Sequence, residues 1–253
     1  INECDLIGFH GQTIFHNPLA KKSLQIGNAI NISNYFKKKI VYDFRSNDLD
    51  CGGQGAPLAP IYHKSIIEEL NLELPTVIIN IGGIANISYW DGEDLIGFDC
   101  GPGNCLMDYI MNKHNLPFDK NGIIASKGNV NENILSKFLS DNYFSKKYPK
   151  SLDKLYFNHY LDNKLIYSQN LSDLMATLSE FTVQSIIKAI KILPKNVKQV
   201  IFCGGGVANL FLMKKLKKRF KIVKKLETHN ISTEFLEAEL IAYLSARKIN
   251  NLP

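Results

Sequence analysis

The sequence lacks the cysteine patterns that mark a structural metal site or a disulfide framework. It contains no CxxC pair, no histidine at metal-ligand spacing from a cysteine, and an odd number of cysteines, five. Disulfide-rich secreted domains and zinc-binding domains show regular cysteine spacings. We therefore expect no structural zinc, no protein metal site, and free thiols in a reducing compartment at Cys4, Cys51, Cys100, Cys105 and Cys203.

Long apolar runs are also missing. No run approaches the roughly 20 residues that a helix needs to cross a bilayer, and no cationic segment followed by an apolar one stands at the beginning. We therefore expect a cytoplasmic protein without a membrane partner. The chain starts at Ile1 and reaches a strand-like run within a few residues, so we interpret it as a piece whose beginning is missing.

Dense clusters of one charge sign are scarce. A net charge of +6 would suit a nucleic-acid partner, but the basic residues are scattered in short runs such as 37–39. Only residues 214–219, KKLKKR, are dense, and their spacing is typical of the solvated face of an amphipathic helix. We favour that interpretation and expect no nucleic-acid partner.

The chain has neither a repeat of solenoid length nor the GxGxxG or GKS/GKT signature of common nucleotide-binding loops. Its 45% hydrophobic content is ample for a core, and strand-like and helix-like runs follow one another along it. Strands are predicted at 6–9, 39–44, 77–81, 87–90, 197–203 and 220–226, and a further strand is predicted to end at residue 99. Helices are predicted at about 28–35, 58–70, 104–115, 174–193 (capped by Ser172 with Asp173), 209–220 and 233–248.

This order of elements is that of an RNase H-like domain preceded by part of a second one. We therefore predict an α/β protein with two RNase H-like domains around a cleft, the first incomplete at its N-terminus. The first domain spans residues 1–72 and the second 73–253, separated where Pro75 prevents continuation of a helix. We place an aromatic-rich insertion of short helices near 118–170 and expect the final helix to pack back toward the first domain.

Two glycine-rich turns lie in residues 80–104, NIGGIANISYWDGEDLIGFDCGPGN, each after a strand-like run. Gly82 and Gly83 form the first turn. Asp99 precedes the second turn, which contains Gly101, Gly103 and Asn104. Successive backbone N–H groups in such turns make anion-binding nests, and a neighbouring carboxylate indicates phosphate chemistry with a base beside it. Ordinary hairpin turns are the alternative interpretation.

Other polar groups follow predicted strands. His10 comes after the first strand, where it would bind a sugar or phosphate or simply occupy a turn, and Asp43 and Arg45 follow the second strand. Residues 48–60, with three glycines and two prolines, are predicted to form a long loop. Such long loops are uncommon unless they have a function. A third turn, Gly204, Gly205 and Gly206, separates a strand from a helix that starts near Asn209 and resembles a nucleotide-binding turn.

Taken together, these motifs resemble the anhydro-N-acetylmuramic acid kinase family, within the sugar kinase, Hsp70 and actin superfamily. They occur in family order and cover nearly the whole chain. They are GFHGQT at 8–13, LQIGN at 24–28, DFRSNDLDCGGQGAPLAPIYH at 43–63, NIGGIANIS at 80–88, GFDCGPGN at 97–104, MD at 107–108 and CGGGVAN at 203–209.

The resemblance implies an actin-like ATPase fold and a kinase that uses ATP and Mg²⁺ to open the 1,6-anhydro ring of anhydro-N-acetylmuramic acid and to phosphorylate O6. By similarity, Asp99 is the base that activates water, and His10, Arg45 and Glu237 bind the sugar. The remaining implied residues bind phosphate or nucleotide: Gly82, Gly83, Gly101, Gly103, Asn104, Gly204, Gly205, Gly206 and Asn209. A homodimer is also implied.

Two departures from the family pattern stand out. The family's first strand and its phosphate-gripping turn do not precede Ile1, and Ser46 and Asn47 follow Arg45 where the family is richer in arginine. Two alternatives therefore stay open, which are a kinase of the same architecture that acts on another sugar and a nucleotide-binding relative without catalysis.

Overall fold

The computed structural model describes residues 3–152, 154–161, 164–220, 223–226, 231 and 235–252. The chain divides into two units. Unit 1 comprises Ile1–Tyr62 and Glu234–Pro253, and unit 2 comprises His63–Thr233. The division therefore falls between residues 62 and 63, inside helix α3 (Pro60–Glu69), and not at the predicted position after residue 72. Helices and strands occur in both units, so the predicted α/β class is confirmed.

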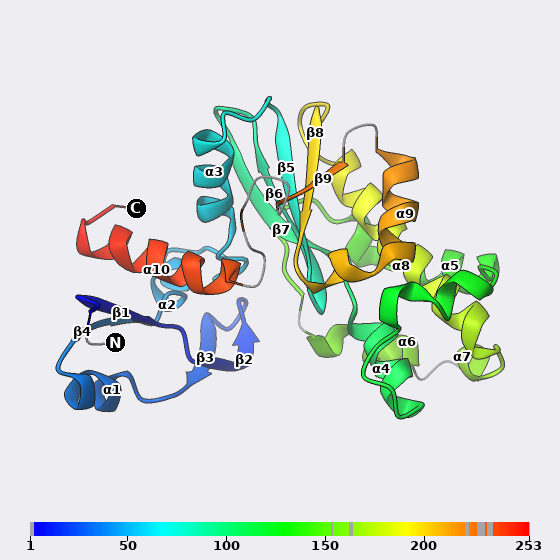
Figure 1. Ribbon diagram of the computed structural model, residues 1–253, viewed down its shortest axis with the longest axis horizontal. Coiled ribbons are helices and arrows are strands. Elements are labelled where there is room, and N and C mark those ends of the chain that lie inside the picture. Colours follow the sequence, from blue (N-terminus) through cyan, green and yellow to red (C-terminus); the bar gives the residue numbers. More distant parts are fainter. Residues whose placement is uncertain are drawn as a thin grey trace. The chain divides into compact units, whose positions relative to one another are not determined.

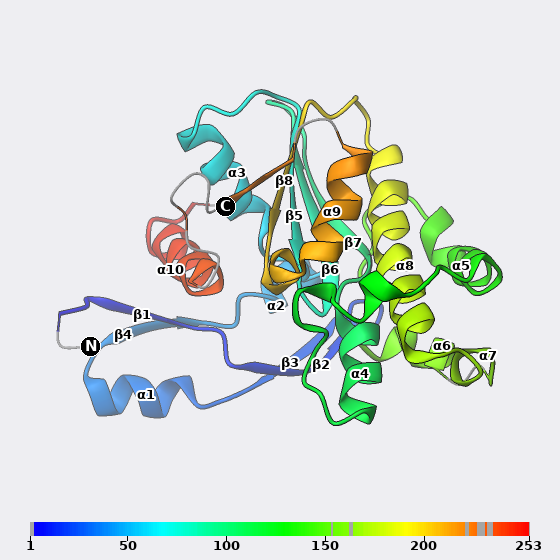
Figure 2. The same cartoon turned by 45° about the vertical axis from the view of Figure 1, so that its right-hand side comes forward.

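Unit 2 is built on a five-stranded sheet in the order β7-β6-β5-β8-β9 (Figures 1 and 2). β6 runs antiparallel to both β5 and β7, whereas β8 runs parallel to β5 and β9 runs parallel to β8. The strand bounds are β5 Thr76–Ile81, β6 Ile84–Trp90, β7 Leu95–Pro102, β8 Gln199–Cys203 and β9 Val223–Lys225.

Helices cover both faces of this sheet. Helices α8 (Leu171–Lys191) and α9 (Leu210–Arg219) pack apolar residues against side chains such as Ile79, Ile87 and Phe202. Helix α3 meets the other face, where buried His63 lies 2.8 Å from the Ser88 hydroxyl. The strands are buried on both faces, and this explains their nearly continuous apolar sequence.

A second core lies beside helix α8. It is formed by α4 (Cys105–Lys113) and by the insertion, whose aromatic rings cluster around Phe181. The insertion consists of short helices, as predicted. Their bounds are η1 Lys120–Gly122, η2 Ala125–Lys127, α5 Glu132–Leu139, η3 Asn142–Ser145, η4 Lys154–Phe157, α6 Asn158–Leu161 and α7 Lys164–Tyr167.

Unit 1 contains two small sheets. Strands β1 (Leu6–Phe9) and β4 (Lys39–Tyr42) are parallel, and β2 (Gln12–Asn17) and β3 (Lys22–Ile26) form an antiparallel hairpin. Helix α10 (Leu236–Ile249) packs on β1 at Gly8, where a Cβ would collide with the Ser245 side chain. The other helices are α1 (Ala29–Phe36) and α2 (Ser46–Asp50).

Several predicted elements differ from the structure. Residues 12–26, where no strand was predicted, form the β2–β3 hairpin, and α2 occupies the start of the predicted 48–60 loop. Helix α8 is capped by Asn170, whose side chain accepts from Asp173 N, and not by Ser172. The final helix was expected from Thr233, which lies outside the described residues, and α10 itself begins at Leu236.

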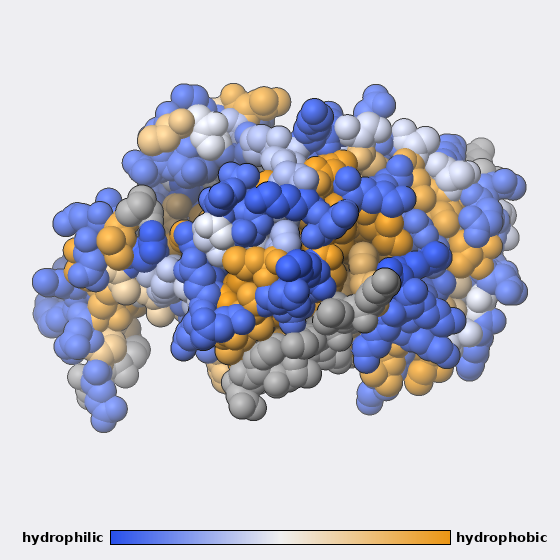
Figure 3. Space-filling model, turned by 90° about the horizontal axis from the view of Figure 1, so that it is seen from above, coloured by the Kyte–Doolittle hydropathy of each residue, from blue (hydrophilic) through white to orange (hydrophobic). Residues whose placement is uncertain are grey.

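No described helix is long and apolar enough to cross a membrane. In the space-filling view of Figure 3, apolar patches reach the surface between hydrophilic residues.

Candidate functional site

The two glycine turns of residues 80–104 meet in the structure. The N–H groups of Gly103 and Cys105 donate to the Gly83 carbonyl oxygen over 2.9 and 3.1 Å, and Asn104 N donates to Gly82 O over 2.8 Å. A Cβ at Gly103 would collide with the Gly82 carbonyl oxygen. Glycine is therefore required at position 103 because two backbones approach closely there.

These hydrogen bonds change the interpretation of the second turn. The N–H groups of Gly103 and Asn104, expected to form part of an anion nest, already donate to carbonyl oxygens. They fix one turn against the other and are not directed at a ligand. Gly101 lies where β7 meets α8, and a Cβ there would collide with Ser185.

The turn after β8 packs on the end of β5. A Cβ at Gly204 would collide with the Asn80 side chain, and one at Gly206 would collide with Ile81. Among the described residues, apart from Gly205 and its two chain neighbours, no atom lies within 4 Å of a Cβ built at Gly205, so this position is open there. Asn209 caps α9, because its side chain accepts from Leu212 N over 3.0 Å.

A cavity of about 450 Å³ lies beside this turn in unit 2. Its lining combines four of the predicted nucleotide residues with parts of α4 and the insertion. The lining residues are Asn104, Met107, Asp108, Phe118, Asp119, Lys120, Asn121, Gly205, Gly206, Ala208 and Asn209. Burial raises the pKa of the Asp108 carboxyl. Sequence reasoning missed residues 118–121, which carry no nucleotide-binding motif and reach the cavity only through folding of the insertion.

The predicted base, Asp99, is buried on β7, with 7% of its surface exposed. Its neighbours Phe98 and Cys100 point into the sheet core, so strand alternation directs Asp99 away from that core. Leu152 N donates to the Asp99 carboxylate over 2.7 Å, and the Tyr143 hydroxyl donates to the Asp99 carbonyl over 2.6 Å. The 450 Å³ cavity is not lined by Asp99.

Unit 1 brings two of the predicted sugar-binding residues, His10 and Arg45, into contact. The Arg45 guanidinium lies 3.0 Å from His10 Nε2 and donates to the Gly55 carbonyl over 2.6 Å. Burial lowers the pKa of His10, the Arg45 charge also lowers it, and the hydrogen bond to Gly11 and the Glu237 charge oppose them. A neutral His10 accepts from Arg45 at Nε2 and donates from Nδ1 to Gly11 O over 2.8 Å.

A second cavity, of about 330 Å³, opens next to His10 in unit 1. Polar side chains on β3, just before α1 and just after β4 contribute to its lining, among them Ser23, Gln25, Asn28 and Asp43. Arg45 is not among its lining residues. The hydrogen bond from Arg45 to the Gly55 carbonyl and the one from Gly55 N to the Asp48 carboxylate, over 2.6 Å, both hold the loop after α2.

Within the described ranges, no three or more His, Cys, Asp or Glu side chains gather closely enough to hold a metal ion. The five cysteines, which all lie within the described ranges, form no disulfide.

Comparisons with known proteins identify relatives of the chain. A family model described as anhydro-N-acetylmuramic acid kinase matches residues 1–253. The anhydro-N-acetylmuramic acid kinase of Pelagibacter ubique is 40% identical over 254 residues, which cover 97% of this chain and 68% of the relative. The protein of that name from Rhodopseudomonas palustris (strain BisB18) is 37% identical over 255 residues, covering 99% and 69%. The chain thus spans about two thirds of the length of these relatives.

Among solved structures, component A of (R)-2-hydroxyglutaryl-CoA dehydratase from Acidaminococcus fermentans aligns with a TM-score of 0.44 and 13% identity. The alignment covers 79% of this chain and 67% of that chain. A likeness of this extent establishes no shared function.

Proposed function

Because the chain belongs to the anhydro-N-acetylmuramic acid kinase family, a family of phosphotransferases, we propose that it opens the 1,6-anhydro ring of anhydro-N-acetylmuramic acid and phosphorylates O6 with ATP. The product is N-acetylmuramic acid 6-phosphate, in the recycling of bacterial cell wall. We further propose that both units are RNase H-like, with unit 2 binding the nucleotide and unit 1 the sugar. The homodimer and the cytoplasmic location stay predictions.

The observation that carries this proposal is the packing of the glycine turn that directly follows Asp99 against the turn formed by Gly82 and Gly83. Their hydrogen bonds fix the end of β7 to the β5–β6 connection. Phosphoryl transfer depends mainly on positioning and on electrostatic stabilisation, so rigid backbone turns next to a carboxylate suit it. The sheet of unit 2, with three antiparallel strands followed by two parallel ones, supports the RNase H-like assignment of that unit.

In the proposed reaction the Asp99 carboxylate takes a proton from water as the water oxygen bonds to C1. The C1–O6 bond breaks, and O6 bonds to the γ-phosphorus while the bond between that phosphorus and the bridging oxygen of ADP breaks. Glycoside cleavage commonly needs an acid for the departing oxygen, but here phosphorus captures it. The proton on Asp99 then passes to solvent.

We assign the nucleotide to the 450 Å³ cavity, because its volume and its polar groups suit such a ligand. Gly205 offers room for close approach of a ligand. Mg²⁺ would neutralise charge on the phosphates during transfer. Since the described residues hold no cluster of metal-ligating side chains, we expect the phosphates to supply most of its ligands.

We assign the sugar to unit 1, where Arg45 contacts His10 and the Glu237 charge acts on the pKa of His10. A neutral His10 held by Arg45 presents a fixed polar group beside the 330 Å³ cavity. Carbohydrate hydroxyls need such fixed donors and acceptors, because buried polar groups of a ligand must be paired. The polar side chains in the lining of this cavity, such as Gln25 and Asn28, support the assignment.

The proposal is tested by a coupled assay of ADP release by the full-length gene product with anhydro-N-acetylmuramic acid. We expect sugar-dependent ADP release, and Asp99→Asn should lower kcat by about 10²–10⁴-fold, the usual effect of removing a general base. Asp94→Asn, which changes an exposed carboxylate just before the same strand, is the matched control.

Three outcomes would contradict the proposal. Wild-type protein that binds ATP without sugar-dependent turnover would indicate a non-catalytic relative. Full activity of Asp99→Asn would exclude Asp99 as the base. Faster turnover of another sugar in a substrate panel would replace the proposed substrate and leave the reaction class intact.

A further inference from the structure

Residues 143–152 lie along the edge of the unit 2 sheet and contact Asp99 three times. Asp99 N donates to the Lys150 carbonyl over 3.1 Å, so this segment is hydrogen-bonded to the edge strand β7 at that residue. Leu152 N donates to the Asp99 carboxylate over 2.7 Å, and the Tyr143 hydroxyl donates to the Asp99 carbonyl over 2.6 Å. The backbone and the carboxylate of Asp99 are thus both held by one segment.

Lys150 is a buried cation that anchors this segment. Only 7% of the residue is exposed, and its Nζ donates to the carbonyl oxygens of Lys146 and Tyr143 over 2.9 and 3.2 Å. The ammonium also lies over the rings of Tyr143 and Phe98, at 4.7 and 5.5 Å from their centroids. Burying a cation is costly unless it is paired, so these contacts fix the turn before Lys150 strongly.

Tyr143 couples the segment to the aromatic core. Burial raises the pKa of its hydroxyl, so the group stays protonated and remains a donor to Asp99 O. Its ring packs edge-on against Phe144, which in turn packs edge-on against Phe181 on α8. Movement of Tyr143 would therefore require movement of the core.

We propose that Tyr143 and Lys150 are positioning residues for the reaction, which hold the 143–152 segment so that Leu152 N–H orients the Asp99 carboxylate. Neither residue needs to touch substrate. The inference rests on the proposed role of Asp99 as the base and adds a device that sets its geometry. A misplacement of about 1 Å at a reacting group can lower a rate about 10²-fold, so such a device has a measurable effect.

The test compares two tyrosines of one aromatic cluster in the full-length protein. Tyr143→Phe removes the hydroxyl that contacts Asp99, and Tyr160→Phe removes one that contacts Phe138 O and Asp141 instead. Each variant loses one buried hydroxyl, so we expect similar small drops in melting temperature. We expect kcat to fall about 5–10-fold in Tyr143→Phe only, which corresponds to the loss of about one hydrogen bond. The KM for the sugar should stay within about twofold of wild type in both variants.

The decisive measurement is the double variant Asp99→Asn/Tyr143→Phe. If Tyr143 acts through Asp99, adding Tyr143→Phe to Asp99→Asn should lower the residual kcat no further. Lys150→Met should lower kcat at least as much as Tyr143→Phe, and Lys150→Arg, which keeps the cation, should restore part of the loss.

Wild-type kcat in both Tyr143→Phe and a folded Lys150→Met, or a full additional loss in the double variant, would overturn the inference. These outcomes differ from failure of the proposed function itself, in which Asp99→Asn alone would keep full activity.

Discussion

The interactions that stabilise the inside of unit 1 differ from those that stabilise the inside of unit 2. In the described part of unit 2, apolar side chains from strands β5 to β8 and from the six helices α4 to α9 fill two cores. In the described part of unit 1, the buried apolar side chains are Ala29, Leu49 and Leu236. Large apolar residues of the β2–β3 hairpin are about half exposed there, namely Ile14, Phe15, Leu24 and Ile26.

This difference bears on the two candidate sites. The glycine turns and Asp99 of unit 2 are fixed by close-packed backbone and by a surrounding core. His10 and Arg45 of unit 1 depend on a few hydrogen bonds to each other and to loop carbonyls. We therefore expect the nucleotide side to be sensitive to changes in packing and the sugar side to be sensitive to changes in single polar groups.

The largest expected effect comes from the packing of unit 2. Phe181 is fully buried among aromatic rings, and Phe181→Ala should lower the free energy of unfolding by about 3–5 kcal/mol. The matched variant in unit 1, Phe15→Ala, removes a ring that is 48% exposed and should cost less than about 1 kcal/mol. Denaturant unfolding measures both. Equal losses of unfolding free energy in the two variants would contradict the proposed difference between the two units.

The next effect tests the polar construction of unit 1. Arg45→Met removes a cation whose hydrogen bonds to Gly55 and His10 are worth about 1.5–3 kcal/mol in all. We expect the KM for the sugar to rise about 10–100-fold and the Kd for ATP, measured by calorimetry, to stay within about twofold. Lys22→Met, which removes an exposed cation on β3 of the same unit, is the control. A matching loss of ATP affinity would contradict the assignment of ligands to units.

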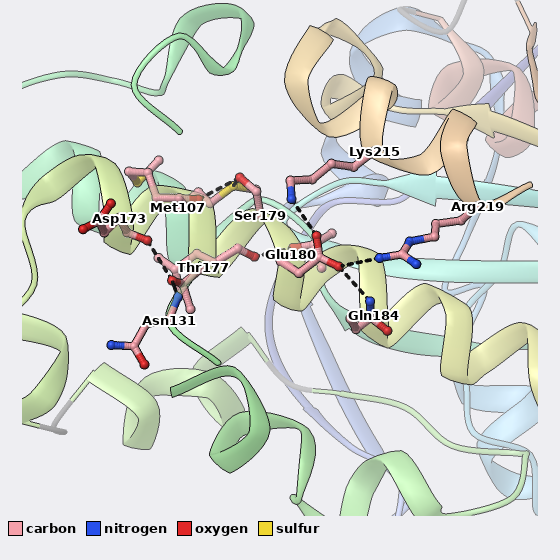
Figure 4. Close-up of polar contacts among 12 residues, drawn as sticks. Met107, Asn131, Asp173, Thr177, Ser179, Glu180, Gln184, Lys215 and Arg219 are labelled. Carbon is pink, nitrogen blue, oxygen red and sulfur yellow. Dashed lines mark hydrogen bonds and ion pairs between the residues drawn. The ribbon is translucent and has the colours of Figure 1, made fainter. Parts of the chain in front are cut away.

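The smallest effect concerns a polar cluster within unit 2. Glu180 on α8 accepts from Lys215 over 2.7 Å and from Gln184 over 2.7 Å, and lies 3.5 Å from Arg219 (Figure 4). Burial alone would raise the pKa of the Glu180 carboxyl, but these hydrogen bonds and charges outweigh it and lower the pKa. Because α8 and α9 are also joined by a large core, Glu180→Gln should cost only about 1 kcal/mol at pH 7.

The pH dependence of this cost has a definite sign. A carboxyl with a lowered pKa in the folded state contributes stability that is present above its unfolded pKa, about 4.3, and is lost as pH falls through the folded pKa. The stabilities of wild type and Glu180→Gln should therefore converge below about pH 4. A difference that stays constant from pH 7 to pH 3 would exclude this explanation.

Much of unit 2 was predictable because its signals are local. Continuous apolar runs ended by glycine or proline located β5, β7 and β8, and Asn209 marked the start of α9. The β2–β3 hairpin was missed because its strands mix polar and apolar residues and have no glycine turn between them. The cap of α8 was misplaced by two residues, since Asn170, Ser172 and Asp173 are all good capping residues.

By itself, the sequence determined the α/β class, the family and the glycine turns around Asp99, since these depend on residue types close together in the chain. Only the tertiary structure decided that the N–H groups of Gly103 and Asn104 bind a neighbouring turn and that residues 118–121 line the cavity. It also brought Tyr143 and Lys150 to Asp99. These contacts join segments far apart in sequence, and their partners are chosen by packing and hydrogen-bond satisfaction, which no local pattern encodes.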